Sequence, residues 1–289
     1  MSRLYETLRR MEMAHRHPGV PTPDPAQTVE MLSGAIAQSS ERPTGTATKL
    51  QATPSARLVS LTDTASLGAE KFRALAIRLE NLNSQRSIKA LQVTSGIVNE
   101  GKSLVSANLA VTLARRGRSK VLLIEGDLHR PTISSLLGST PPLGLVQWWN
   151  DQKKDLTHYL YQLDEMPLWF LGAGGQPHKP SEILESQQFA EEFKKLTAWF
   201  DWIVVDSTPM LPAVDANIWS RLVNGTLLVV REGVASVKAL KEGLASLDNP
   251  KLVGIVLNEA SDFDRTNYAQ HYLNVLRPWK KSGGVREQQ

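Results

Sequence analysis

Residues Gly96 to Ser103 fit the phosphate-binding pattern G-x-x-x-x-G-K-[ST] at every position. In such a loop the glycines let backbone N–H groups turn inward around an anionic phosphate, and the positive end of the following helix adds to the attraction. Lys102 can then reach the β- and γ-phosphates of a nucleotide, and the Ser103 hydroxyl can bind Mg²⁺. An ordinary glycine turn is the alternative. The motif predicts a nucleotide site made by Gly96, Asn99, Glu100, Gly101, Lys102, Ser103 and Leu104.

Acidic residues follow two apolar runs that have no polar alternation. Glu125 and Asp127 come directly after the run 121–124, and Asp206 comes after the run 202–205. Unbroken apolar runs are typical of parallel strands that are buried on both faces. Carboxylates at the carboxyl ends of such strands lie in the crevice where open α/β sheets bind ligands. A turn-forming role is the alternative for each acid. The position of Asp206 is the one expected of a Walker B acid, which lies close to the Mg²⁺ bound near Ser103.

The elements that must position these residues alternate between strands and helices. Strands are expected around residues 91–93, 121–124, 168–171, 202–205, 225–231 and 252–258, and helices over 69–79, 104–116, 182–200 and 238–247. Ser181 is expected to cap the third of these helices. The alternation predicts an α/β fold: a doubly wound, mostly parallel sheet of six or seven strands, of the P-loop NTPase type, with helices on both faces.

The composition changes along the chain and suggests four regions. Residues 1–16 have the pattern of a short amphipathic helix, which either docks on a partner or domain or is a frayed tail. Residues 17–57 contain six prolines among small polar residues, as a flexible linker does. The phosphate-loop domain is expected over 58–278, and residues 279–289 form a basic, disordered tail.

The overall numbers exclude several classes of protein. The 289 residues include no cysteine, which excludes disulfides and thiolate chemistry, and a net charge of +4 is too small to favour nucleic-acid binding. The sequence contains no run of 18 apolar residues, so no membrane span is predicted. The polar first residues do not have the pattern of a signal peptide. If the protein works at a membrane, a partner must hold it there.

Several segments together resemble the bacterial tyrosine kinases of capsule and exopolysaccharide synthesis, the BY-kinases, which are related to the ParA/MinD ATPases. The likeness covers residues 65–260 and rests on segments 94–103, 108–110, 121–131, 174–184, 203–209, 215–216 and 224–233. The start of the chain, residues 1–12, resembles some stand-alone members. ParA/MinD ATPases carry a signature lysine five residues before the loop lysine, where this chain has Ile97. The kinase branch is therefore preferred over a partitioning ATPase.

The resemblance implies a role for each matching residue. Lys102 neutralises the γ-phosphate of ATP, while Ser103, Asp127 and Asp206 hold Mg²⁺ directly or through water. Glu125, as the first acid after its strand, activates the attacking tyrosine hydroxyl. Asn258, at the end of the last strand, is a candidate contact for adenine.

Four positions depart from the family pattern. Glu125 stands where an aspartate is usual, His129 where an arginine is usual (although Arg130 follows), and Val98 where a proline is usual. The extra methylene of Glu125 moves its carboxylate by more than an ångström, enough to slow a positioned base. The E-x-x-R-x-x-R motif, which the family uses in ring assembly, is Glu70, Arg73 and then Ala76 here, so the motif is incomplete and ring assembly stays open. A homo-oligomer is one possibility that the resemblance implies.

The tyrosine cluster that family members carry at the C-terminus is thin here. Tyr268 and Tyr272 follow the last strand and would share one face of a helix. A structural role and a phosphoacceptor role both stay open for them.

The resemblance implies an ATP- and Mg²⁺-dependent protein tyrosine autokinase that regulates polysaccharide polymerisation or export. It implies a cytoplasmic protein, recruited to the inner face of the membrane by a membrane-bound chain-length protein that activates it. The alternative is a catalytically weakened P-loop ATPase that acts as a nucleotide switch on the export machinery.

Overall fold

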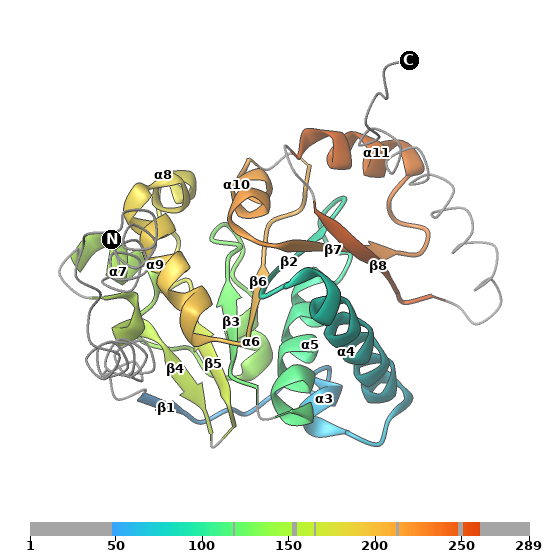
Figure 1. Ribbon diagram of the computed structural model, residues 1–289, viewed down its shortest axis with the longest axis horizontal. Coiled ribbons are helices and arrows are strands. Elements are labelled where there is room, and N and C mark those ends of the chain that lie inside the picture. The colour runs from blue at the N-terminus through green and yellow to red at the C-terminus, as the bar shows by residue number, and fades with distance from the viewer. Residues whose placement is uncertain are drawn as a thin grey trace, which may run out of the picture. The chain divides into compact units, whose positions relative to one another are not determined.

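The computed structural model describes residues 48–117, 119–151, 155–164, 166–211, 214–247 and 251–260. Within them an eight-stranded sheet has the order β1-β4-β5-β3-β6-β2-β7-β8 (Figure 1). The strands are β1 (Thr48–Leu50), β2 (Ala90–Ser95), β3 (Val121–Glu125), β4 (Tyr161–Leu163), β5 (Leu168–Leu171), β6 (Trp202–Asp206), β7 (Gly225–Arg231) and β8 (Leu252–Asn258). All neighbouring pairs are parallel except β4 with β5. This confirms the predicted α/β fold.

Helices cover both faces of the sheet. They are α3 (Val59–Thr62), α4 (Leu67–Arg86), α5 (Lys102–Arg116), α6 (Ile133–Leu137), α7 (Leu145–Asp151), the 3₁₀ helix η1 (Leu156–Tyr159), α8 (Pro180–Glu185), α9 (Gln187–Trp199), α10 (Asp215–Leu222) and α11 (Val237–Ser246). In Figure 1, α4 and α5 lie on one side of the central strands, and α9 and α10 lie on the other.

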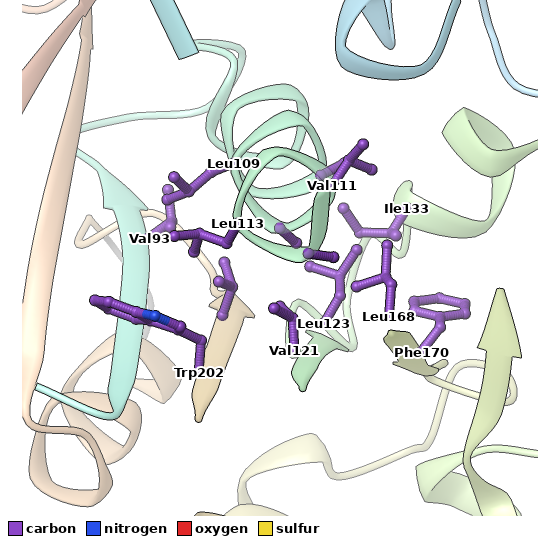
Figure 2. Close-up of a cluster of buried hydrophobic side chains, with 14 of the residues drawn as sticks. Val93, Leu109, Val111, Leu113, Val121, Leu123, Ile133, Leu168, Phe170 and Trp202 are labelled. Carbon is purple, nitrogen blue, oxygen red and sulfur yellow. The ribbon is translucent and has the colours of Figure 1, made fainter. Parts of the chain in front are cut away.

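Alternation along β3 and β6 explains why both are apolar up to their last residue. Val121 and Leu123 of β3 pack with α5 in one core, whereas Leu122 and Ile124 pack with α9 and α10 in the other. Figure 2 shows Leu109 and Leu113 of α5 packed over the first of these faces. Because both faces are covered, neither set of positions tolerates polar residues.

Asn108, fully buried on α5, fastens the segment that precedes α4. Its Oδ1 accepts from the Ser60 N–H at 3.0 Å, and its Nδ2 donates to the Arg57 carbonyl at 3.2 Å. Leu58 between them is fully buried. The ordered domain that the sequence predicts to begin near Leu58 is thus held at its start by the Asn108 hydrogen bonds as well as by the buried Leu58 side chain.

The structure adds two strands that the sequence pattern does not reveal. β1 and β4 have three residues each, too few for a periodic signal, and they pair with one another at the edge of the sheet. The range predicted as linker, 17–57, therefore contains a strand at 48–50. The other predicted parts of the termini, residues 1–47 and 261–289 with Tyr268 and Tyr272, lie outside the described residues.

The expected helix over 182–200 is two helices, and its predicted cap is wrong. Ser186 ends α8 and caps α9, where its Oγ accepts from the Phe189 N–H at 3.1 Å. Ser181 lies inside α8 instead, and its hydroxyl donates to Asp215 Oδ1 at 2.7 Å. Serine at either position fits the helix-start pattern, so the sequence alone does not distinguish them.

Candidate nucleotide and phosphoryl-transfer site

The phosphate loop joins the carboxyl end of β2 to the first turn of α5. Asn99 and Gly101 have positive φ angles, 65° and 89°, which turn the backbone before Lys102 starts the helix. Glu100 lies inside the loop and is fully buried, and its carboxylate accepts from the Ile97 N–H at 2.9 Å. Burial raises the pKa of Glu100, while N–H groups of Ile97, Arg231 and Gly96 lower it in part. The loop is thus shaped by its own buried acid.

Lys102 and Asp127 form an ion pair across the site. Lys102 Nζ lies 2.8 Å from Asp127 Oδ2, and the two side chains are 13% and 4% exposed. The other Asp127 oxygen accepts from the Arg130 N–H at 3.0 Å. The structure therefore brings together two residues that the sequence predicts for the site, the loop lysine and the second acid of the 125–127 segment.

Asp206 lies beneath these residues at the end of β6 and is fully buried. Burial raises its pKa to about 7, although Lys102 and the Ser103 hydroxyl lower it, and the charges of Asp127 and Glu125 add to the rise. Its Oδ2 has no hydrogen-bond partner among the described residues. A buried carboxylate oxygen without a partner is costly and needs an explanation. Beside a serine hydroxyl and a second acid, it fits a hard cation such as Mg²⁺, which prefers oxygen ligands.

Gly126 makes this proximity possible, and the sequence analysis did not single it out. Its N–H donates to the Asp206 carbonyl at 2.8 Å, and its carbonyl accepts from Trp219 Nε1 at 3.2 Å. A Cβ at this position would lie 2.9 Å from the same Asp206 carbonyl oxygen and 2.8 Å from Val205. A glycine between two acids is the signal that could have identified it, because only this residue lets β3 and β6 end so close together.

The Glu125 carboxylate lies near enough to Asp206 to raise its pKa, but Glu125 does not line the cavity and its hydrogen bonds go to other segments. It is almost completely buried, and three donors hold it: the N–H and hydroxyl of Ser134, and the N–H of Ala173, each at 3.1 Å. These donors belong to α6 and to the loop after β5. In this arrangement the carboxylate ties β3 to two neighbouring segments, and its hydrogen-bonding capacity is largely used there.

His129 occupies the position where an arginine is usual, and it contacts a different acid. Its Nε2 lies 3.0 Å from Asp215 Oδ2, and the Ser181 hydroxyl donates to the other oxygen. Asp215 is almost completely buried at the start of α10, while the His129 side chain is half exposed. The His129 ring thus lies against Asp215, where the segment after β3 meets the start of α10.

A cavity of about 920 Å³ opens over these groups. Its lining includes the predicted residues Asn99, Gly101, Lys102, Ser103, Leu104 and Asp127, together with Arg57, His129, Arg130, Asp215, Arg231 and Glu259 from other segments. Gly96, Glu100, Glu125, Asp206 and Asn258 are not among the lining residues. Asn258 instead donates through Nδ2 to the Glu100 carbonyl at 2.9 Å. The volume is in the range of small-molecule sites.

Comparison with known proteins identifies the family. The chain is 32% identical over 205 residues to the tyrosine-protein kinase YwqD of Bacillus subtilis, a match that covers 70% of this chain and 85% of that protein. It belongs to the bacterial tyrosine-protein kinases. The chain is also 30% identical over 230 residues to the succinoglycan biosynthesis transport protein ExoP of Rhizobium meliloti, covering 71% of this chain and 28% of that protein.

A solved structure agrees with this assignment. The kinase domain of the Escherichia coli tyrosine kinase ETK superposes with a TM-score of 0.64 at 26% identity, over 71% of this chain and 82% of that domain. A scan of protein-family models gives no match. In the part of the chain that the structure describes, no helix has the length and hydrophobicity that a membrane span requires.

Proposed function

We propose that this tyrosine kinase transfers the γ-phosphoryl group of ATP to tyrosine residues, including its own Tyr268 and Tyr272, and so regulates the polymerisation or export of a polysaccharide. The observation that carries the proposal is the convergence of Lys102, Asp127, Ser103 and Asp206 beside one cavity. Family membership supports the reaction class. Phosphoryl transfer requires mainly positioning and neutralisation of charge, which these groups can supply.

Each residue has a defined part in this proposal. The loop N–H groups and Lys102 bind the β- and γ-phosphates, and Lys102 exchanges its pairing with Asp127 for one with phosphate. Ser103, Asp127 and Asp206 would hold Mg²⁺, directly or through water, and the Oδ2 of Asp206 is the buried atom that needs such a partner. When bound, Mg²⁺ supplies positive charge that stabilises the phosphoryl oxygens.

For Glu125 we propose a role other than the general base that the resemblance implies. A general base must come within hydrogen-bond reach of the tyrosine hydroxyl. The Glu125 carboxylate instead accepts three hydrogen bonds from Ser134 and Ala173. We therefore assign it a positioning role, in which it fixes the segment that carries Asp127.

This arrangement also favours a second candidate function. If no group replaces Glu125 as base, the protein binds and slowly hydrolyses ATP without transferring phosphate, as a nucleotide switch on the export machinery. The two functions share the nucleotide site and differ in the fate of the γ-phosphate.

We further propose that the kinase is cytoplasmic and is held at the membrane by a chain-length or export protein, which activates it, and that it forms a homo-oligomer. The similarity to ExoP supports the first part, since that transport protein contains a matching region within a much longer chain.

Phosphotyrosine formation separates the two functions. Purified protein is incubated with Mg-ATP and the cytoplasmic fragment of the candidate partner, and phosphotyrosine is mapped by mass spectrometry. The kinase function predicts label that Lys102→Met abolishes and that Tyr268→Phe with Tyr272→Phe largely removes. ATP hydrolysis without label on the wild type would support the switch instead. Label at other tyrosines would refute the acceptor sites and leave the enzyme class in place.

A further inference from the structure

The phosphate loop is fastened to the ends of β7 and β8 through one residue, Glu100. The Glu100 carboxylate accepts from the N–H of Arg231, the last residue of β7, at 3.2 Å. The Glu100 carbonyl accepts from the side-chain amide of Asn258, the last residue of β8, at 2.9 Å. Arg231 and Asn258 are also partners in the register of these two strands. The loop therefore has a defined support outside itself.

The contact between Asn258 and the loop is also steric. Gly101 has a φ of +89°, and a Cβ there would lie 2.2 Å from Asn258 Nδ2 and 3.3 Å from its Cγ. The Asn258 amide thus packs directly on the backbone of Gly101. The next residue is Lys102, so a change in this amide acts on the turn that aims the lysine into the cavity.

The surroundings of Asn258 do not favour contact with the nucleotide base. The neighbouring Arg231 and Glu259 form an ion pair and line the cavity. Asn258 itself is absent from the residues that line it, and one N–H of its side-chain amide donates to the Glu100 carbonyl. An amide whose N–H₂ group is used in this way is placed to hold the loop.

We propose that Asn258 is a positioning residue for phosphate binding: it sets the shape of the phosphate loop through Glu100 and Gly101. This role rests on the proposed nucleotide site and adds to it a residue from the last described strand. It predicts that Asn258 contributes to affinity for any ligand that carries a triphosphate, whatever its base. A residue that reads adenine would contribute to affinity for ATP and to the preference for ATP over GTP.

The test measures the Mg²⁺-dependent affinities of the full chain for ATP, GTP and inorganic triphosphate. The variants are Asn258→Ala, which removes the amide, and Asn258→Asp, which keeps the size and loses the donor. Asn81→Asp, an exposed change on α4, is the matched control for added charge. Thermal unfolding without ligand confirms that each variant is folded. AMP serves as a ligand that carries the base without the β- and γ-phosphates.

The positioning role predicts a similar loss, about tenfold for one hydrogen bond, in the affinities for ATP, GTP and triphosphate. The affinity for AMP and all affinities of Asn81→Asp stay as in the wild type. A loss confined to ATP and AMP, with GTP and triphosphate unaffected, would overturn the role and assign Asn258 to adenine. Unchanged affinities in both variants would also overturn it. A wild type that binds none of these ligands would refute the proposed nucleotide site itself, and this role with it.

Discussion

Glu125 and Asp206 are two buried acids at the ends of adjacent strands, and they differ in how far the protein satisfies their hydrogen-bonding capacity. Glu125 accepts three hydrogen bonds from neighbouring segments. One oxygen of Asp206 has no hydrogen-bond partner within the described part of the chain, and burial raises the pKa of this acid to about 7. The hydrogen bonds of Glu125 lie within the protein and hold neighbouring segments, whereas the unsatisfied oxygen of Asp206 is a cost that a bound cation can remove. The predictions below test this difference.

The largest expected effect is on catalysis by Asp206→Asn. Loss of the carboxylate removes a ligand for Mg²⁺ and should lower the rate of phosphotyrosine formation by roughly 10²–10³-fold, as for the loss of one strong electrostatic group in other sites. Initial rates with saturating Mg-ATP give the measurement. Asp63→Asn, an exposed change near α3, is the control and should have the wild-type rate. A rate within threefold of wild type for Asp206→Asn would remove this acid from the mechanism.

The same substitution should stabilise the protein when Mg²⁺ and nucleotide are left out. The folded-state pKa of Asp206 is raised from 3.8 to about 7, so between these values the folded state binds more protons than the unfolded state. Its contribution to the free energy of unfolding therefore falls as the pH rises through this window. All other titratable groups are common to both proteins, so the difference in free energy of unfolding between Asp206→Asn and wild type isolates the contribution of this acid.

Urea unfolding at pH 5 and pH 8 measures that difference. The free energy of unfolding of Asp206→Asn, relative to that of the wild type, should be higher at pH 8 than at pH 5 by an amount on the order of a few kcal/mol. Excess Mg-ATP should reverse the order at pH 8, because it binds the wild-type folded state more strongly. An advantage that shrinks as the pH rises would contradict the raised pKa.

Glu125→Gln should affect stability more than catalysis. The amide group cannot accept from all three N–H and O–H donors, so a buried donor loses its partner, at a cost of about 1–3 kcal/mol. Chemical denaturation measures this loss. The rate of phosphotyrosine formation, measured where the variant is fully folded, should stay within about threefold of wild type, since a group that only positions others contributes less than a base does.

Ser134→Ala should have the smallest effect and should refine the Glu125 result. It removes one of the three donors, the hydroxyl at 3.1 Å, and leaves the N–H of the same residue in place. The expected loss of stability is about 0.5–1.5 kcal/mol, with no change in transfer rate. Combined with Glu125→Gln, the two losses should be less than additive, because the substitutions share a hydrogen bond. Full additivity would show that the two side chains do not interact.

Much of the site could be predicted from the sequence because its signals are local. The phosphate loop is one continuous pattern, and Asp127 and Asp206 each end an apolar run, so the parallel sheet necessarily brings them to one edge. The structure places Lys102 and Asp127, two of the predicted site residues, in contact.

The remainder depends on where side chains point, which spacing does not encode. Glu125 and Asp127 are two residues apart, yet the bend at Gly126 sends one toward Ser134 and the other toward Lys102. Asn258 is far from Glu100 in the sequence, and their contact arises from strand order. The short strands β1 and β4 are held by pairing with each other and carry too few residues for a periodic signal.

The most direct test of the difference between the two acids is the ratio of transfer rates for Glu125→Gln and Asp206→Asn, measured side by side with Mg-ATP and the same acceptor. If Asp206 serves the reaction and Glu125 serves the structure, Glu125→Gln should form phosphotyrosine at least about 30-fold faster than Asp206→Asn. Equal inactivity of the two variants, with Glu125→Gln still folded and still binding ATP, would contradict the account and restore Glu125 as the catalytic base.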